Sequence, residues 1–340
     1  MGDDNKGLPG CFKMGCIGCG VLVALMVGST LFLGAVQLSF QGREPDIQRA
    51  DREQALPPSP VTFSEATPES LDTAAVDGAT GEIPAVDAPE MVTHLPPLDI
   101  PSDVKPGVVA VDFSTGNFDI RAGEPGEPIR VEAEYDANSF VLEEKLEEND
   151  GSWNYSVKFK SRLFGFIGGE GGDNRVTLII PRDQPVHLVG EIGLGESDLE
   201  LGGLWLHEID LDLGIGEHRI TFDEPTLEPM ERFILDSSIG ELDVRRLGNA
   251  SPQVVRLEGG IGENSLDLRG AWQNDATIDT EFRIGEHRLT LPDDVHVEMD
   301  ATRVALGERS GRDIDRSNVP EGAPTLKIRA SGLIGELRID

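Results

Sequence analysis

Cysteine is nearly absent from this 340-residue sequence, and its three copies all lie near the N-terminus, at Cys11, Cys16 and Cys19. The 321 residues after Cys19 contain none, so disulfides do not hold the folded part together. Cys16-Ile-Gly-Cys19 has CxxC spacing but lacks the second pair that a zinc site needs. A thiol pair at a membrane edge or an acylation site is the alternative.

Basic residues are scarce as well. Lys and Arg total 29 against 62 Asp and Glu, and the formal net charge is -33. This balance excludes nucleic-acid binding through the folded part, because phosphate contacts need a basic face. It also argues against docking on anionic lipid. The acidity indicates either a surface kept soluble by charge or a specific cationic partner.

The N-terminal region has one stretch without charge, residues 14–42, and Ile17–Phe40 is mostly apolar. Twenty-four helical residues span about 36 Å at about 1.5 Å each, enough to cross a bilayer. The apolar core is longer than that of a cleaved signal peptide, and no small-x-small site follows it. We therefore expect a cytoplasmic tail at 1–13, a single-pass anchor at 14–42 and an extracytoplasmic remainder.

Residues 43–105 have the composition of a tether. Eleven of the 22 prolines fall between Pro45 and Pro106, and no Lys or Arg occurs between Arg52 and Lys105. Low hydropathy with negative charge predicts a disordered acidic linker. A short helix over Arg43–Leu56, continuing out of the membrane, is the alternative for its first part.

The rest of the chain contains a repeat, in which an apolar residue is followed by Gly-Glu. The glycines are 21, 24, 22, 23, 22 and 28 residues apart, which indicates a repeat array. The longest gap contains an insertion around Asn318–Ala323. The copies are Leu194-Gly195-Glu196, Ile215-Gly216-Glu217, Ile239-Gly240-Glu241, Ile261-Gly262-Glu263, Ile284-Gly285-Glu286, Leu306-Gly307-Glu308 and Ile334-Gly335-Glu336.

Each copy predicts two strand segments around a glycine turn. Apolar residues alternate before the turn, and they recur three and five positions after the glutamate. The pattern predicts an all-β fold, a β-solenoid with coils of about 22 residues, over 106–340; an antiparallel meander is the alternative. Within the solenoid we expect Ile239, Ile261 and Ile284 to form a buried ladder, with exposed glutamates after them. Ile261→Asp would then unfold the domain.

The domain 106–340 divides into an irregular first part, 106–190, and regular coils, 191–340. In the first part, Val108–Arg121 predicts a degenerate first copy, and three further strands are expected at Ile129–Tyr135, Trp153–Lys160 and Arg175–Pro181. No part of 106–340 has a convincing long helical stripe; Val141–Glu148 is the best helix candidate, although it is short.

The chain ends at Asp340, directly after the last copy, so we expect the final coil to be the open end of the solenoid. Either Arg309–Arg316 or Asn318–Ala323 covers that end, or ends of two chains pair in a limited homo-oligomer.

The run Val176–Pro181, then Val186–Leu188, then the Gly-Glu coils, resembles the bacterial toast-rack or "putative-adhesin" β-repeat domain. It is also similar to the C-terminal domain of Lia-type cell-envelope stress regulators. The likeness covers roughly 107–340. It implies a single-stranded β-helix, often attached to a membrane, and it supplies no established catalytic residues.

Three groups of residues are candidate sites. The repeated glutamates, if stacked, form a carboxylate ladder that either binds cations weakly or is simply solvated. His218 and His287 are expected to be exposed turn residues about 14 Å apart, too far for one metal. The apolar cluster Leu163, Phe164, Phe166 and Ile167 is expected to cover the core or to contact a partner.

No pattern predicts a catalytic nucleophile, and Gly165–Gly172 lacks the Gly-Lys-Ser/Thr of a phosphate loop. We therefore expect no catalytic, cofactor-binding or metal-binding residues and no cofactor. The sequence favours a non-catalytic interaction or scaffold module at the bacterial cell envelope, with a protein or glycan partner. A Lia-type envelope-stress regulator and a glycan-active β-helix enzyme are the second and third hypotheses.

Overall fold

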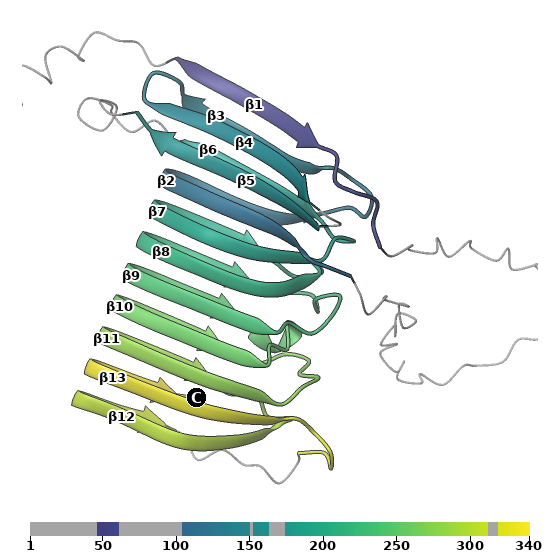
Figure 1. The fold of residues 1–340 in the computed structure, drawn as a ribbon. Helices are drawn as coiled ribbons and strands as arrows, with labels where there is room; N and C mark the ends of the chain where they lie inside the picture. Colours follow the sequence, from purple (N-terminus) through teal and green to yellow (C-terminus); the bar gives the residue numbers. More distant parts are fainter. Residues whose placement is uncertain (1–45, 61–103, 150–151, 163–173, 312–318) are drawn as a thin grey trace, which may run out of the picture.

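The computed structural model describes residues 46–60, 104–149, 152–162, 174–311 and 319–340 (Figure 1). The expected membrane anchor, the three cysteines, the apolar cluster at 163–167 and most of the expected linker lie outside these residues. In the part of the chain that the structure describes, no helix has the length and apolarity needed to cross a membrane.

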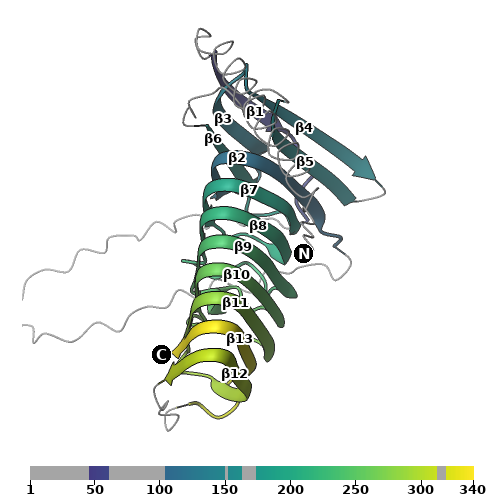
Figure 2. The same cartoon turned by 90° about the vertical axis from the view of Figure 1, so that its left-hand side faces the viewer.

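One long strand per coil forms the body of the domain, and these strands pair in parallel (Figures 1 and 2). Parallel pairing confirms the solenoid and excludes the meander for these coils. The strands, in spatial order, are β2 (Gly107–Gly123), β7 (Val186–Glu200), β8 (Leu206–Thr221), β9 (Arg232–Arg245), β10 (Val254–Asp267), β11 (Ala276–Thr290), β13 (Thr325–Ile339) and β12 (His296–Gly311).

A column of glycines runs through all eight strands, because equivalent glycines are register partners. Their φ angles lie between +133° and +154°, a region that is essentially open only to glycine. In the seven strands after β2, a Cβ atom would lie only 1.7–1.9 Å from the carbonyl oxygen of the neighbouring glycine. The glycine column is Gly116, Gly195, Gly216, Gly240, Gly262, Gly285, Gly335 and Gly307.

Each strand bends at this column, and the bend shifts the alternation of inward and outward side chains. In β9, Leu235 and Leu242 are buried, whereas Ser238 and Ile239, two consecutive residues, are both exposed. In β9 the inward positions are therefore four, six and eight residues before Glu241 and one and three residues after it, whereas Ile239, two residues before Glu241, points outward.

The expected buried ladder is therefore wrong. Ile239, Ile261 and Ile284 are 44%, 48% and 42% exposed. The alternation before the bend places them inside, but the extra outward residue at the corner turns them out. Ile261→Asp is accordingly not expected to unfold the domain.

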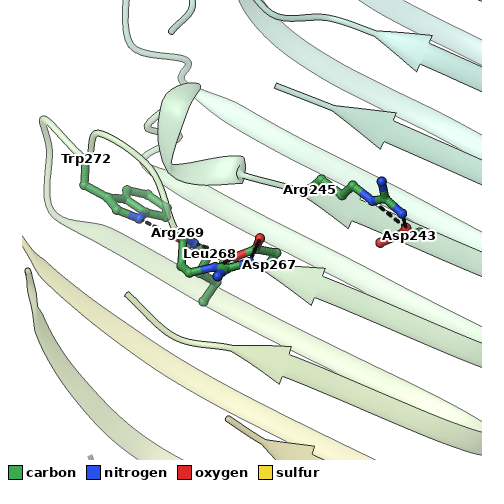
Figure 3. Close-up of polar contacts among 6 residues, drawn as sticks. All are labelled: Asp243, Arg245, Asp267, Leu268, Arg269 and Trp272. Carbon is green, nitrogen blue, oxygen red and sulfur yellow. Dashed lines mark hydrogen bonds and ion pairs between the residues drawn. The ribbon is translucent and has the colours of Figure 1, made fainter. Parts of the chain in front are cut away.

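The core lies inside the bent strands and is closed by the segments that return from one coil to the next. The apolar residues three and five positions after the glutamates are buried, as predicted, for example Leu266 and Leu268. Asn249 links three return segments: its Nδ2 donates to Phe222 O at 2.7 Å, and its Oδ1 accepts from Ala271 N at 3.0 Å. Nearby, Trp272 Nε1 donates to Leu268 O (Figure 3).

In the irregular first part of the domain, residues 106–190, the sheet splits beyond β2 into two groups of strands. Val108–Phe113 of β2 pairs with β5 (Ser152–Ser161), and Asn117–Gly123 pairs with β6 (Arg175–Pro181). The outer strands are β4 (Phe140–Asn149) on β5 and β3 (Ile129–Asp136) on β6. The degenerate first copy and the three expected strands are thus confirmed.

The helix candidate Val141–Glu148 is wrong, because it lies within strand β4. Leu142 is buried, and the Glu144 side chain, two residues on, is only 4% exposed and accepts a hydrogen bond from the Tyr155 hydroxyl at 2.7 Å. A spacing of two between inward side chains is typical of a strand. Antiparallel pairing with β5 stabilises this strand over a helix.

The expected disordered linker is wrong for residues 46–60. Strand β1 (Ile47–Gln54) pairs antiparallel with β3, which also excludes a helix over Arg43–Leu56. Ion pairs such as Arg49–Glu134, at 3.1 Å, hold it in place. Gln184 Nε2 then donates to Pro57 O at 2.8 Å. Composition does not reveal that a distant strand edge is free to receive this segment.

The final coil is not the open end. Strand β13 lies between β11 and β12, and Asp340 N donates to Leu289 O at 2.9 Å. The long gap between the last two glycines therefore belongs to a connection that leads back into the stack. The outer strand is β12, on which Arg309 is the register partner of buried Leu337. Pairing between chain ends stays a prediction.

Gly262→Ala should lower the free energy of unfolding by about 3–5 kcal/mol, because it combines a strained φ with a backbone clash. Urea unfolding followed by circular dichroism measures the change. Gly126→Ala is the control, since Gly126 also has a positive φ, +77°, but nothing lies within 4 Å of its added Cβ. It should cost about 1 kcal/mol. Equal losses in both variants would contradict the account of the glycine column.

Candidate interaction face

The corner of the solenoid carries a continuous row of exposed apolar side chains, which we call the apolar ridge. Its members are register partners in adjacent strands and are 40–65% exposed. At about 4.8 Å per strand, seven members extend over about 29 Å. The apolar ridge comprises Leu194, Ile215, Ile239, Ile261, Ile284, Ile334 and Leu306.

A column of glutamates flanks the apolar ridge on the C-terminal side of the bend. The repeated glutamates are register partners, as the sequence predicted, and each is exposed or half-buried. Towards β12 arginines neutralise the column: Arg288 contacts Glu286 at 3.3 Å, and Arg338 contacts Glu336 at 3.0 Å. Hydrogen bonds from Arg338 and Ser310 lower the pKa of Glu336. This glutamate column is Glu196, Glu217, Glu241, Glu263, Glu286, Glu336 and Glu308.

A second acidic column flanks the apolar ridge on its other side, three residues before the ridge positions from Leu194 to Ile284, and it continues into β2. Sequence reasoning missed it, although the acid recurs at this phase in successive copies. Burial raises the pKa of Asp236, and the neighbouring charges of Glu258 and Asp212 raise it further. The second acidic column is Asp112, Glu191, Asp212, Asp236, Glu258 and Glu281.

An open depression of about 430 Å³ lies beside the second acidic column, over β2, β7 and β8. Asp112, Glu191 and Asp212 line it together with Gly190. A Cβ on Gly190 would lie 1.9 Å from Val111 O, so the glycine lets the strands approach there. The depression thus presents carboxylates beside Val111 and Val189.

These carboxylates are arranged as columns rather than as clusters. Within the described ranges, no group of three or more His, Cys, Asp or Glu side chains has the arrangement of a metal site. Steps of about 4.8 Å along a line explain this, since no more than two successive acids can bring their oxygens within 2.3–2.6 Å of one cation, which needs six to eight oxygens. The arrangement suits an extended cationic partner better than one ion.

The two histidines are not exposed turn residues, so that expectation is wrong. His218 is 3% exposed and His287 is fully buried, because the position after each glutamate points inward past the bend. Leu242 and Asn264 occupy the same row between them, which confirms the spacing of three coils. Burial lowers the pKa of His287 to about 4.

Ser197 and His218 form a pair with catalytic residue types but without access. Ser197 Oγ lies 2.8 Å from His218 Nδ1, and both side chains are at most 5% exposed. Burial also lowers the pKa of His218. With so little exposed surface, the pair belongs to the interior of the coil.

The chain resembles one described protein family over part of its length. Residues 97–245 match the family described as the N-terminal domain of toast_rack, DUF2154. The toast-rack resemblance is therefore confirmed. No curated protein matches the sequence.

Solved structures similar to the chain include bacterial proteins described as adhesins. A "putative cell adhesion protein" from Clostridium sporogenes is 15% identical, with 69% of this chain and 92% of that one covered and a TM-score of 0.33. A "putative adhesin" from Bacteroides fragilis is 13% identical, with 70% and 94% covered and a TM-score of 0.34.

His287→Leu should remove an acid-dependent loss of stability. The folded-state pKa of about 4 lies below the ordinary 6.5, so the unfolded chain binds a proton first as the pH falls. His287 therefore lowers the free energy of unfolding progressively between pH 6.5 and pH 4, by about 3 kcal/mol in total. Urea unfolding at a series of pH values measures this slope.

The control for this slope is His296→Leu, because His296 is exposed on β12. His296→Leu should leave the pH dependence as it is in the parent chain. Leucine is suited to position 287, since Leu337 is its partner in the next strand. An unchanged slope in His287→Leu would contradict a buried neutral imidazole.

Proposed function

We propose that this protein is a non-catalytic interaction module of the bacterial cell envelope, and that its binding face is the apolar ridge with its two acidic flanks. The observation that carries the proposal is the register of the ridge. Seven exposed apolar side chains stand in line on a backbone that the glycine column holds in one conformation. A continuous exposed apolar row of this kind is typical of a protein contact surface.

The chemistry of the described residues supports binding rather than turnover. The carboxylates are spread along columns, whereas a glycoside hydrolase needs two acids set across one bond. The toast-rack family match and the adhesin descriptions of solved proteins agree with an interaction role.

The same proposal includes a single-pass anchor at residues 17–40 and an extracytoplasmic solenoid. The support is the uncharged, apolar sequence of 14–42 and the short tail before it.

Photo-crosslinking in living cells tests the binding face. A photoreactive amino acid at Ile239 or Ile261 should yield discrete crosslinked species, because these side chains stand on the apolar ridge. The control position is Glu228, exposed on the return segment between β8 and β9. Equal patterns from Glu228 and Ile239, or no crosslinks from either ridge position, would contradict the proposed face.

Protease added to intact cells, with the outer barrier permeabilised where there is one, tests the orientation. The solenoid should be cleaved from the cell while a cytoplasmic marker protein stays intact. Protection of the solenoid until the cytoplasmic membrane is lysed would place it on the cytoplasmic side and overturn this part of the proposal.

A further inference from the structure

The two flanks make the apolar ridge selective for one sign of charge. Glu217, Glu241 and Glu263 form no ion pair among the described residues, and neither do Asp212, Asp236 and Glu258 on the other side. The middle of the ridge, over β8, β9 and β10, is thus an apolar line between two rows of carboxylates that form no ion pair among the described residues. Only a partner with cations on both sides of an apolar stripe compensates both rows.

The same charges exclude other occupants. A second copy placed ridge to ridge would bring acidic columns against acidic columns, and like charges at such distances repel. An anionic bilayer is repelled for the same reason. Addition of a β-strand is excluded on this face, because the backbone groups of these strands already pair with the adjacent coils.

The dimensions fit a helix. The ridge rises in steps of about 4.8 Å, close to the pitch of about 5.4 Å at which an amphipathic helix repeats its apolar stripe. About 20 helical residues match the length of about 29 Å. Lysine or arginine side chains on both sides of the stripe would reach the two acidic columns, and the depression beside Glu191 and Asp212 is open to such a side chain.

We infer that the apolar ridge binds a basic amphipathic helix of a partner protein, centred over β8–β10, with its apolar stripe on Ile215, Ile239 and Ile261. The inference rests on the proposed function and names the chemical class of its partner. Towards β12 the ridge contributes less to the binding of a basic helix, because Arg288 and Arg338 already neutralise the glutamate column there.

The probe is a synthetic 20-residue peptide with leucines on one helical stripe and lysines on both sides of it. Its binding is measured by fluorescence anisotropy to the full-length chain in phosphatidylcholine nanodiscs, with empty nanodiscs subtracted. A scrambled peptide of identical composition should bind at least tenfold more weakly. Raising the salt concentration should weaken binding of the stripe peptide, because screening reduces the ionic attraction.

Variants locate the binding site. Ile239→Ser with Ile261→Ser should weaken binding of the stripe peptide at least tenfold, without loss of fold, since both side chains are exposed. The matched control is Val254→Ser, an apolar residue 41% exposed outside the ridge. It should bind like the parent chain.

A second set of variants tests the charges. Asp212→Asn, Asp236→Asn and Glu258→Gln together should weaken binding and reduce its salt dependence. Three exposed acids elsewhere form the control set: Glu228→Gln, Asp293→Asn and Asp294→Asn. Equal effects of the two sets would reduce the interaction to non-specific ion exchange and overturn the inference.

The outcomes separate this inference from the proposed function. If both peptides bind equally, or if neither binds, while Ile239 still crosslinks in cells, the interaction face stands and the helix is the wrong partner class. If Ile239 gives no crosslinks in cells, the proposed function itself fails. Tight, stripe-dependent binding that the ridge variants abolish supports the inference.

Discussion

The rest of the structure depends on the glycine column at the bend of each coil. Eight strands place a glycine at the same register position, with φ values that exclude other residues and with backbones in close approach. This constraint bends every strand at the same place and keeps the coils in phase. It also inserts one extra outward residue, which reverses the inside and outside of all positions that follow.

The apolar ridge is a direct consequence of that reversal. A residue such as Ile239 belongs to the inward phase of the first half of its strand, yet it stands outside, between Asp236 and Glu241. The same reversal places His218 and His287 inside, where burial keeps them neutral. Surface chemistry and core chemistry thus follow from one backbone feature.

Much of the fold was predictable from the sequence. A period near 22 residues sets the length of each coil, and the repeated Gly-Glu sets the register between adjacent strands. The residues three and five after each glutamate could be placed in the core for the same reason. The ridge could not be placed, since alternation on either side of Gly240 gives opposite answers for Ile239. Extending the alternation from both sides of the glycine would have revealed this conflict. The second acidic column could also have been predicted, because its acids stand three residues before the ridge residues.

Other features depend on contacts that the local sequence does not encode. Strand β1 forms because β3 offers a free edge 75 residues further along the chain, as the pairing of Gln54 with Ile129 shows. The position of β13 between β11 and β12 likewise depends on which strand edge is free to pair, and it does not follow from the order of the repeats in the sequence.

Cysteine accessibility tests the central claim most directly. In a chain whose Cys11, Cys16 and Cys19 are replaced by serine, single cysteines are placed at position 239 or position 242 and treated with a maleimide under native conditions. The account predicts rapid labelling of Ile239→Cys and protection of Leu242→Cys until the chain is unfolded. Protection of position 239 with labelling of position 242 would show that the bend does not reverse the phase, and would contradict both the ridge and the function proposed for it.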